Sequence, residues 1–401
     1  MQQSHISIIG AGLGGLCLAQ GLRSAGISFD VYERDTAAAS RDQGYRIRID
    51  AEGQAALSRC LPANLHELFR QSCGGSAGGV RFLDCDLQRI QGRPAGSWRI
   101  PDAGGDAPVP PRDLSANRQT LREILLCGIE DRVHFGKALR RFDVVGKNQV
   151  RIQFDDGEET TSALLVGADG VNSAVRAQLA PAAEPVDTGA ACIYGKTAAT
   201  AALRESIGTD LWAGTSVVFA DGFALILDPM LFRQPLPALA ARLAPACRLE
   251  PVDDYLYWAF IGPRASLRLA AGELPDQSQL ATLVGAIARR WHPRLRTLFA
   301  HGDARTLTVL PVRSSPPEIA AWQSGPVTLL GDAIHSMSPA GGVGANTALR
   351  DAAALASALA SGAGFHEAVS GYEVAMRAWA RAAITASNDG ARRLFGASAT
   401  S

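Results

Sequence analysis

Lysine is almost absent from this chain of 401 residues, and neither sign of charge is in excess. Lysine occurs only at Lys137, Lys147 and Lys196, so arginine carries nearly all of the basic charge. The 39 basic and 39 acidic residues give a formal net charge of zero. Because nucleic acids are bound by strongly basic surfaces, we expect no nucleic-acid partner.

Long apolar runs are missing as well. No stretch of about 18 or more apolar residues is free of charges, so the sequence predicts no membrane span. The first residues lack the basic segment of a secretion signal, and their glycine pattern is typical of a strand and turn. We therefore expect a cytoplasmic protein with no membrane partner.

The cysteines form no recognisable framework. Their number is odd, they are scattered, and neither a C-x-x-C pair nor a histidine at metal spacing accompanies them. They are Cys17, Cys60, Cys73, Cys85, Cys127, Cys192 and Cys247. This pattern is typical of buried thiols in a reducing compartment, and we expect neither disulfides nor a metal.

What the chain does contain is concentrated in residues 325–346. An apolar strand at 327–330 ends in Gly331 and Asp332, and a loop rich in proline and glycine leads to a helix starting near Asn346. The carboxylate can accept hydrogen bonds from sugar hydroxyls, the glycines allow a flat group to approach, and the helix start favours negative charge. This segment predicts a site for a sugar-linked ring that becomes anionic.

A second motif follows the strand at residues 6–9. Gly10 fits a tight turn, Gly12 a close approach of pyrophosphate, and Gly15 the packing of the next helix on the strand. Leu13 and Gly14 belong to the same loop. Glu33 ends the next strand, 18 residues beyond Gly15, near the spacing of about 20 for an acid that binds ribose. Arg34 is either a phosphate contact or a solvated surface charge.

The third motif spans residues 164–176. An apolar strand again ends in glycine and a carboxylate, Asp169, and a helix follows. The structural alternative is an ordinary turn in which Asn172 or Ser173 caps that helix.

Along the chain, the glycine motif at residues 10–15 comes first, the Asp169 motif second and the Asp332 motif third. In this order the three motifs resemble the FAD-dependent aromatic hydroxylases, the p-hydroxybenzoate hydroxylase family of single-component flavin monooxygenases. The resemblance spans nearly the whole chain. It implies an α/β fold with a discontinuous Rossmann-like FAD-binding domain, an antiparallel β-sheet substrate domain and a C-terminal helical segment. It also implies non-covalent FAD, with NAD(P)H as a transient co-substrate. No second dinucleotide fingerprint is present, as the family pattern requires.

The resemblance also implies roles for individual residues. The glycine motif at residues 10–15 would bind the ADP half of FAD, with Glu33 on its ribose, and Asp332 would bind the ribityl chain. Asp169 matches a position credited with positioning the pyrophosphate and contacting NAD(P)H. The segment lying against the flavin ring would comprise Pro339, Gly342, Val343, Gly344, Ala345 and Asn346.

Two arginine sites also fit the family pattern. Arg118, at the start of a predicted helix, resembles an arginine that reaches FAD, although a helix-surface position is the alternative. Strand alternation in residues 45–50 places Arg46 and Arg48 on one face, with Tyr45 and the isoleucines on the other. Which of the two arginines contacts FAD stays open, because many relatives carry glycine at one of these positions.

The motifs divide the chain into two predicted domains. Residues 1–72, 101–180 and 318–401 would form the FAD-binding domain, and residues 73–100 and 181–317 the substrate domain. Segments 79–83, 216–219, 223–227 and 255–261 have strand character and predict a sheet covering the flavin. Residues 277–300 predict a helix outside that sheet, broken at His292 and Pro293.

The function implied by the resemblance is hydroxylation of an aromatic or polycyclic phenolic small molecule by a flavin hydroperoxide formed from NAD(P)H and O2. No protein nucleophile is needed. Tyr45, Tyr194 and Tyr257 are candidates for an acid or base only because they lie in predicted pocket strands, where packing is the usual role. His335 is expected to orient the loop by a hydrogen bond. We expect a monomer or a homodimer.

Three alternatives stay open. Flavin-dependent halogenases share the fold, and residues 258–263 resemble their tryptophan motif, but they need a lysine in the first part of the chain, where the first is Lys137. An oxidase or dehydrogenase of the same fold would oxidise its substrate without inserting oxygen. A non-enzymatic binding protein of this fold would have lost the cofactor motifs, and here all three are present.

Overall fold

The computed structural model describes residues 5–38, 45–75, 79–91, 112–220, 222–270 and 274–395. The predicted domain boundary between residues 100 and 101 lies outside these ranges. So do both ends of the chain, the segment before Tyr45 and the segment before Arg112.

A five-stranded parallel sheet organises the part of the chain that carries the three motifs. Its strand order is β16-β10-β1-β2-β6, so the strands preceding the three motifs are direct neighbours. The three strands that precede the motifs are mostly apolar and wholly buried, as expected for a parallel sheet covered on both faces. The strands are β1 (Ile6–Ile9), β2 (Phe29–Glu33), β6 (Val133–Phe135), β10 (Leu164–Gly167) and β16 (Val327–Leu329).

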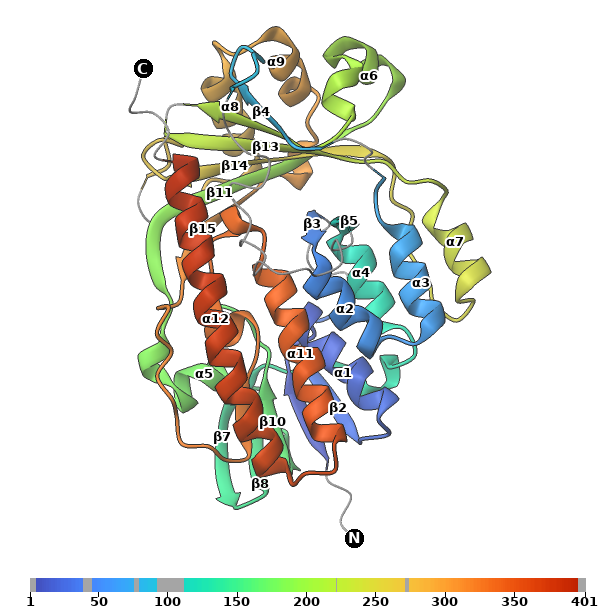
Figure 1. Cartoon of the computed structure of the whole chain (residues 1–401), viewed down its shortest axis with the longest axis vertical. Coiled ribbons are helices and arrows are strands. Elements are labelled where there is room, and N and C mark those ends of the chain that lie inside the picture. Colours follow the sequence, from blue (N-terminus) through green and yellow to red (C-terminus); the bar gives the residue numbers. More distant parts are fainter. Residues whose placement is uncertain are drawn as a thin grey trace, which may run out of the picture.

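Helices cover one side of this sheet (Figure 1). α1 (Leu13–Ser24) packs against α11 (Gly344–Ala360), which also contacts α2 (Ala51–Cys60). A small antiparallel sheet that the sequence did not predict packs elsewhere on this core, where Phe154 meets Tyr32 with ring centroids 4.7 Å apart. Its strands are β7 (Leu139–Gly146), β8 (Gln149–Phe154) and β9 (Glu159–Ser162).

A second, six-stranded sheet lies across the carboxyl ends of the parallel strands (Figure 1). Its order is β15-β11-β14-β13-β12-β4, and neighbouring strands are antiparallel except that β4 and β12 are parallel. The predicted antiparallel sheet is therefore confirmed apart from this edge. The strands are β4 (Arg81–Asp84), β11 (Val186–Ala198), β12 (Ser216–Ala220), β13 (Phe223–Met230), β14 (Tyr255–Pro263) and β15 (Thr308–Ser314), of which β11 and β15 were not predicted.

The two faces of the six-stranded sheet have different neighbours. Trp258 and Phe260 face outward into a cluster covered by α6 (Ala201–Ile207), α8 (Gln277–Ala288) and α9 (Pro293–Ala300). The predicted helix break at Pro293 is confirmed. The opposite face packs toward the parallel sheet, and we call its buried apolar residues the inner cluster: Phe82, Cys192, Tyr194, Val217, Ala224, Met230, Tyr255, Tyr257, Ala259, Ile261, Ala340 and Leu394.

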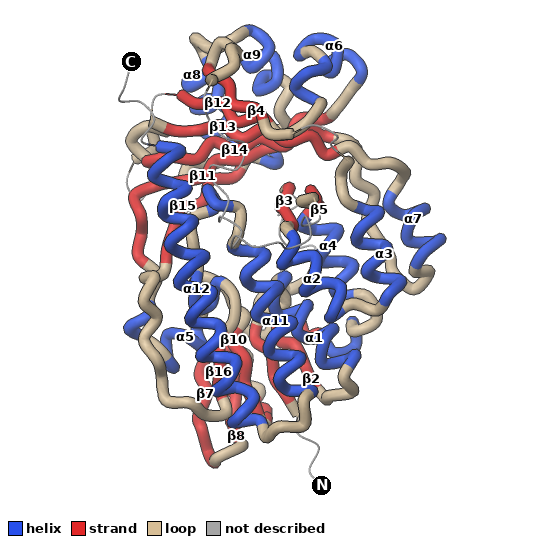
Figure 2. The backbone as a smooth tube through the Cα atoms, viewed as in Figure 1, coloured by secondary structure: helices blue, strands red, loops and turns tan. Residues whose placement is uncertain are grey.

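A short strand pair and one long helix link the two sheets (Figure 2). The strand pair β3 (Arg46–Ile49) and β5 (Leu114–Asn117) projects toward the inner face, and the long α12 (Phe365–Phe395) runs from the parallel sheet to β13 and β14. The remaining helices are α3 (Ala63–Ser72), α4 (Arg118–Leu126), α5 (Ala174–Leu179), α7 (Leu236–Leu243) and α10 (Asp332–His335). Among the helices in the described ranges, none is long and apolar enough to cross a membrane.

Candidate cofactor and substrate site

The three motifs meet at one edge because their strands are parallel neighbours. Gly10 has a φ of +109°, and a Cβ there would lie 2.4 Å from the carbonyl oxygen of Ala168. Only glycine fits both the conformation and the contact. The turn after β1 is thereby packed against the turn after β10, which carries Asp169.

The other fingerprint glycines divide into packing and open positions. A Cβ on Gly15 would lie 2.1 Å from the carbonyl oxygen of Gly10, and one on Gly14 would lie 2.8 Å from Leu330. A Cβ on Gly12 would meet nothing within 4 Å. Gly12 is also the N-cap of α1, which has no side-chain cap and no acid in its first turn. The open space at a helix start fits a pyrophosphate.

Glu33 turns toward this loop from the end of β2. One carboxylate oxygen accepts a hydrogen bond from the Ala11 amide at 2.8 Å, and the other accepts from the Asp35 amide at 3.0 Å. Arg34 is exposed. Arg122, which sequence reasoning missed, is buried and donates from Nε to the Ala11 carbonyl at 2.9 Å. Its position on α4 carries no local signal, because the loop it holds lies far away in the chain.

The Asp169 side chain accepts hydrogen bonds at the start of α5. Its carboxylate accepts hydrogen bonds from the Ser173 hydroxyl at 2.5 Å and from the Ala174 amide at 2.7 Å. Ser173 caps the helix by accepting from the Arg176 amide, so the capping alternative is correct for Ser173. Burial raises the pKa of the Asp169 carboxyl, and the Ser173 hydrogen bond opposes this shift.

Arg176 joins the turn that carries Asp169 to the segment that carries Asp332. Its side chain is 2% exposed, and Nη1 donates to the carbonyls of Val171 at 2.8 Å and Ala333 at 3.5 Å. Ala333 follows Asp332 in α10. One buried guanidinium therefore fixes the spacing of the turns that carry Asp169 and Asp332.

Exposure singles out three positions within the otherwise buried segment 327–346. Asp332, Pro339 and Gly342 are exposed, and the residues around them are buried or half-buried. A carboxylate oxygen of Asp332 lies 3.9 Å from where a Gly344 Cβ would stand, so Asp332 lies beside the start of α11. The enclosing protein raises the pKa of the Asp332 carboxyl, the charges of His335 and Arg118 oppose the shift, and Asp351 reinforces it.

His335 orients this motif from below, as expected. Its Nε2 lies 2.5 Å from a carboxylate oxygen of Asp351, and both side chains are fully buried. The same oxygen accepts from the Gly331 amide at 2.8 Å, and the other accepts from Trp379 Nε1 at 2.7 Å. Burial lowers the pKa of His335, but the charge and hydrogen bond of Asp351, with Asp332, raise it overall.

The loop after Pro339 leads into the start of α11, beside Asp332. Gly342 is left-handed, with a φ of +61°, and α11 begins at Gly344, two residues before the predicted start near Asn346. Val343 is buried and Ala345 half-buried. The Asn346 amide group accepts from the Asp50 amide and donates to the carbonyls of Arg48 and Gly342. Its side chain therefore ties the loop to β3.

The two arginines of β3 reach different partners. Arg48 lies 3.5 Å from Asp50 and 3.4 Å from Asp113, and its Nε lies 3.7 Å from where a Gly342 Cβ would stand. Arg46 instead forms an ion pair of 2.8 Å with Asp228 on β13. Arg48 is thus the arginine beside the predicted flavin loop.

Tyr45 differs from its predicted placement. It precedes β3 and packs on the inner cluster, whereas Ile47 and Ile49 pack in the core of the parallel sheet. The rings of Tyr45 and Tyr194 have centroids 4.7 Å apart, and the Arg118 guanidinium lies 5.5 Å from the Tyr45 ring centre. The charge of Arg118 opposes the rise in pKa of both Tyr194 and Asp332, so the tyrosine pair and Asp332 both lie near this guanidinium.

Burial raises the pKa of both Tyr194 and Tyr257, so neither phenol is prepared to lose a proton near neutral pH. Trp258, from the segment similar to the halogenase motif, points the other way. It is 1% exposed, lies in the outer cluster and donates from Nε1 to Thr197 at 3.1 Å. It does not face the inner cluster.

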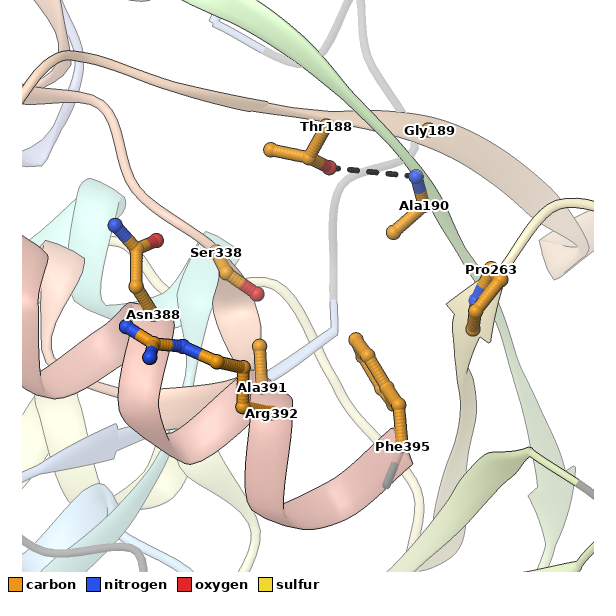
Figure 3. Close-up of a pocket in the computed structure, with 9 residues that line it drawn as sticks. All are labelled: Thr188, Gly189, Ala190, Pro263, Ser338, Asn388, Ala391, Arg392 and Phe395. Atoms are coloured by element: carbon orange, nitrogen blue, oxygen red, sulfur yellow. Dashed lines mark hydrogen bonds between the residues drawn. The ribbon is translucent and has the colours of Figure 1, made fainter.

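A cavity of about 620 Å³ adjoins the predicted flavin loop at Ser338 (Figure 3). Asn388, Ala391, Arg392 and Phe395 of α12 form one wall. The other lining residues are Thr188, Gly189 and Ala190 of β11 and Pro263 of β14. No local sequence pattern indicates this cavity, because its walls come from four distant segments.

Comparisons with known proteins agree with this geometry. The sequence pattern of an FAD binding domain matches residues 267–387, and that of an NAD(P)-binding Rossmann-like domain matches residues 8–53. FAD-dependent monooxygenase dbaB of Emericella nidulans is 30% identical over 383 residues, which cover 87% of this chain and 85% of that protein. A solved structure from Photorhabdus luminescens, named as an FAD-containing monooxygenase, has 32% identity and a TM-score of 0.81, covering 99% of this chain and 100% of that one.

Dual O-methyltransferase/FAD-dependent monooxygenase elcB of Phaeosphaeria nodorum is 37% identical over 393 residues. The match covers 90% of this chain but 41% of that protein, so the chain spans less than half the length of this relative.

The fold and the site define a flavoprotein of the two-sheet type, and the chain belongs to the FAD-dependent monooxygenases. Its cofactor is FAD. The residues present fit that group, because Gly12 borders open space at a helix start and Asp332, Pro339 and Gly342 are the exposed positions of an otherwise buried motif.

Proposed function

We propose that this chain hydroxylates an aromatic or polycyclic phenolic small molecule, using FAD, NAD(P)H and O2. The observation that carries the proposal is the convergence of three glycine and carboxylate turns at one edge of the parallel sheet, beneath the inner cluster of the second sheet. Bound FAD would supply the redox chemistry and the activation of oxygen. The chain would supply binding, orientation and exclusion of water.

Each cofactor contact has a supporting feature. Gly12, Leu13 and Gly14 would present the start of α1 to the pyrophosphate, and Glu33 would hold the adenosine ribose. Asp169, occupied by α5, would shape the pyrophosphate region through its turn. Asp332 would accept hydrogen bonds from the ribityl hydroxyls.

The flavin ring would lie between Pro339 and the loop 342–346, where the start of α11 favours negative charge on the ring. Arg48 is the β3 arginine placed to contact the cofactor, and Arg118 is placed between Asp332 and the Tyr45–Tyr194 pair. These features support a division in which the parallel sheet and its helices bind FAD and the six-stranded sheet binds substrate.

We also propose a reducing, cytoplasmic setting, supported by seven cysteines that are all free thiols, six of them buried. The tyrosines of the inner face would pack on the substrate ring and hold its hydroxyl by hydrogen bonds, since their raised pKa values disfavour a role as base.

The direct test is to purify the protein, add FAD and screen phenolic compounds for stimulated oxidation of NADH or NADPH. We expect a yellow protein, stimulated oxidation, and product labelled from oxygen-18 gas. A protein that stays colourless with added FAD would contradict the cofactor site. Product without the label would instead indicate an oxidase or dehydrogenase of the same fold.

A further inference from the structure

The wall that faces the proposed flavin ring is apolar and aromatic. The inner cluster brings Phe82, Tyr194 and Tyr257 to one face of the six-stranded sheet, together with small side chains such as Ala224 and Ala259. Flat aromatic faces of this kind favour stacking on an aromatic ring system.

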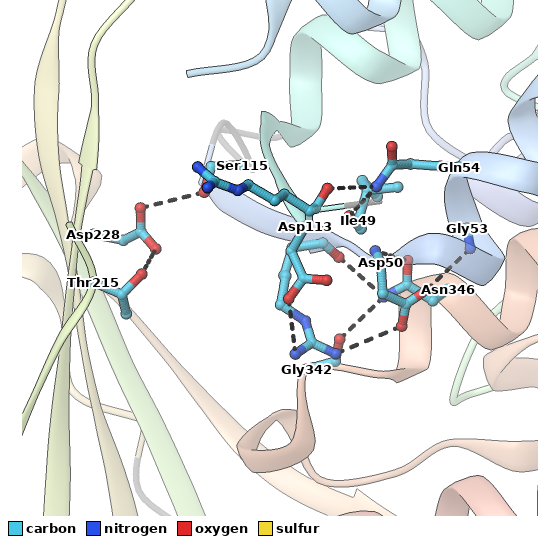
Figure 4. A network of polar contacts seen from close by, with 12 residues as sticks. Ile49, Asp50, Gly53, Gln54, Asp113, Ser115, Thr215, Asp228, Gly342 and Asn346 are labelled. Atoms are coloured by element: carbon cyan, nitrogen blue, oxygen red, sulfur yellow. Dashed lines mark hydrogen bonds and ion pairs between the residues drawn. The ribbon is translucent and has the colours of Figure 1, made fainter. Parts of the chain in front are cut away.

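The cation that reaches this wall from β3 is neutralised. Asp228 lies on the same face of β13 as Ala224 and Ile226, which belong to the inner face. On the neighbouring strand β14 it is opposite Tyr257. It is fully buried and lies 2.8 Å from Arg46, whose side chain is 15% exposed. The Asp228 carboxylate also accepts hydrogen bonds from Thr215 at 2.8 Å and from Ser115 at 3.3 Å (Figure 4).

Other cations near the wall are engaged as well. Lys196 on β11 lies 5.1 Å from the ring centre of Tyr255, Arg118 lies 5.5 Å from that of Tyr45, and Arg48 lies between Asp50 and Asp113. Arg392 of the adjoining cavity pairs with Asp389 at 3.0 Å. An anionic group entering beside Arg46 would lose its water and would have to compete with Asp228 for that cation. Such a loss costs several kcal/mol, unlike the transfer of a neutral ring.

The adjoining cavity is large enough for a ring system of more than one ring. Ala391 and Phe395 pack on the inner cluster and also line the cavity of about 620 Å³. The space beside the flavin loop therefore continues along α12, with room for more than a single ring.

We propose that the substrate is an uncharged aromatic of two or more rings, and that Asp228 excludes carboxylated analogues by neutralising the charge of Arg46 at the wall. The inference rests on the proposed hydroxylase function and names its substrate class. Asp228 is thus a specificity-determining residue, because it decides whether Arg46 presents a net charge to the pocket.

The first experiment compares matched probes on the FAD-loaded protein. Naphthol and hydroxynaphthoate differ by one carboxylate, and phenol and hydroxybenzoate form the same pair with one ring. Binding is followed by the change in flavin absorbance, and turnover by NAD(P)H oxidation. We expect naphthol to bind at least about tenfold more tightly than hydroxynaphthoate and more tightly than phenol. Tighter binding of either carboxylate than of its neutral partner would overturn the inference.

The second experiment removes the neutralising charge. Asp228→Asn leaves Arg46 as a net cation at the wall, and we expect the preference to move at least about tenfold toward hydroxynaphthoate. The double variant Arg46→Gln/Asp228→Asn removes both charges and should retain the preference for naphthol. It also covers the case in which the single variant folds poorly, since replacing both members of a buried pair is often tolerated.

Flavin content and FAD affinity are measured in every variant to separate the two hypotheses. If the protein binds FAD but none of the four probes binds or is turned over, the proposed hydroxylase function and the inference resting on it both fail. If probes are hydroxylated but Asp228→Asn leaves the ratio of naphthol to hydroxynaphthoate unchanged in a folded, flavin-loaded protein, only the role of the ion pair fails.

Discussion

At the residue scale, glycines and one carboxylate define the cofactor site more sharply than any cluster of titratable groups. Gly10 and Gly15 are required by contacts of 2.4 and 2.1 Å to backbone oxygens, whereas Gly12 borders open space. Asp332 is the exposed acid of a buried motif. The packing glycines thus set the shape of the turns, and Gly12 and Asp332 are the positions that we propose to contact the cofactor.

Asp332→Ala should weaken FAD binding about 10- to 100-fold, because hydrogen bonds to a charged group contribute roughly 1.5–3 kcal/mol. Asp332→Asn keeps the shape and one acceptor oxygen, so its loss should be intermediate. Titration of the apoprotein with FAD, followed by flavin fluorescence, gives both affinities. Lys147→Gln, on an exposed turn, is the matched control. An Asp332→Ala affinity equal to that of the control would show that the ribityl contact lies elsewhere.

The local signals explain what could be predicted from the sequence. The glycine turns, the helix start at Arg118, the cap at Ser173 and the helix break at Pro293 depend on neighbouring residues, and the structure contains each of them. The pairing of Arg46 with Asp228 joins residues far apart in the chain. No local pattern indicates such a partner, so the distinction between Arg46 and Arg48 required the fold.

At the element scale, the buried pair of His335 and Asp351 couples α10, α11 and α12. Asp351 on α11 binds the Gly331 amide before α10, His335 at its end and Trp379 on α12. The left-handed turn at Gly331 is held by this carboxylate, and Asp332 follows that turn directly. The orientation of the proposed ribityl contact therefore depends on a network that does not touch the cofactor.

This network predicts a pH-dependent stability. The pKa of His335 is raised in the folded protein, so its stabilising contribution is complete below the unfolded value of about 6.5 and is lost as pH rises through the folded value. His335→Gln keeps a donor for Asp351 but does not titrate. The free energy of unfolding of the wild type relative to this variant should therefore fall as the pH rises above about 6.5 in urea titrations. A constant difference would mean that His335 is uncharged throughout.

Elements were missed where packing overrides composition. β11 contains Gly189 and Gly195, which weaken its strand pattern. Gly195 is required because a Cβ there would lie 2.7 Å from the Trp258 ring. β7 and β9 expose much of their length, so they lack the apolar runs that identified the other strands.

At the scale of the whole molecule, the proposed cofactor site is assembled from segments spread over most of the chain. The turn at 10–15, Arg118 and the loop 332–346 meet only in the folded state, and Arg176 and Asn346 hold their spacing. A ligand that contacts all of these segments binds the folded state alone. Its affinity then adds directly to the stability of the fold.

FAD at about 100 times its dissociation constant should therefore raise the free energy of unfolding by roughly 2.7 kcal/mol, seen as a higher melting temperature that increases with FAD concentration. The same addition to Asp332→Ala should give a much smaller rise at equal FAD, because fewer molecules are liganded. Hydrogen exchange should show slower exchange in residues 10–15 and 332–346 together, since one ligand bridges both. Protection confined to one of these segments would contradict a single FAD site built from the three motifs.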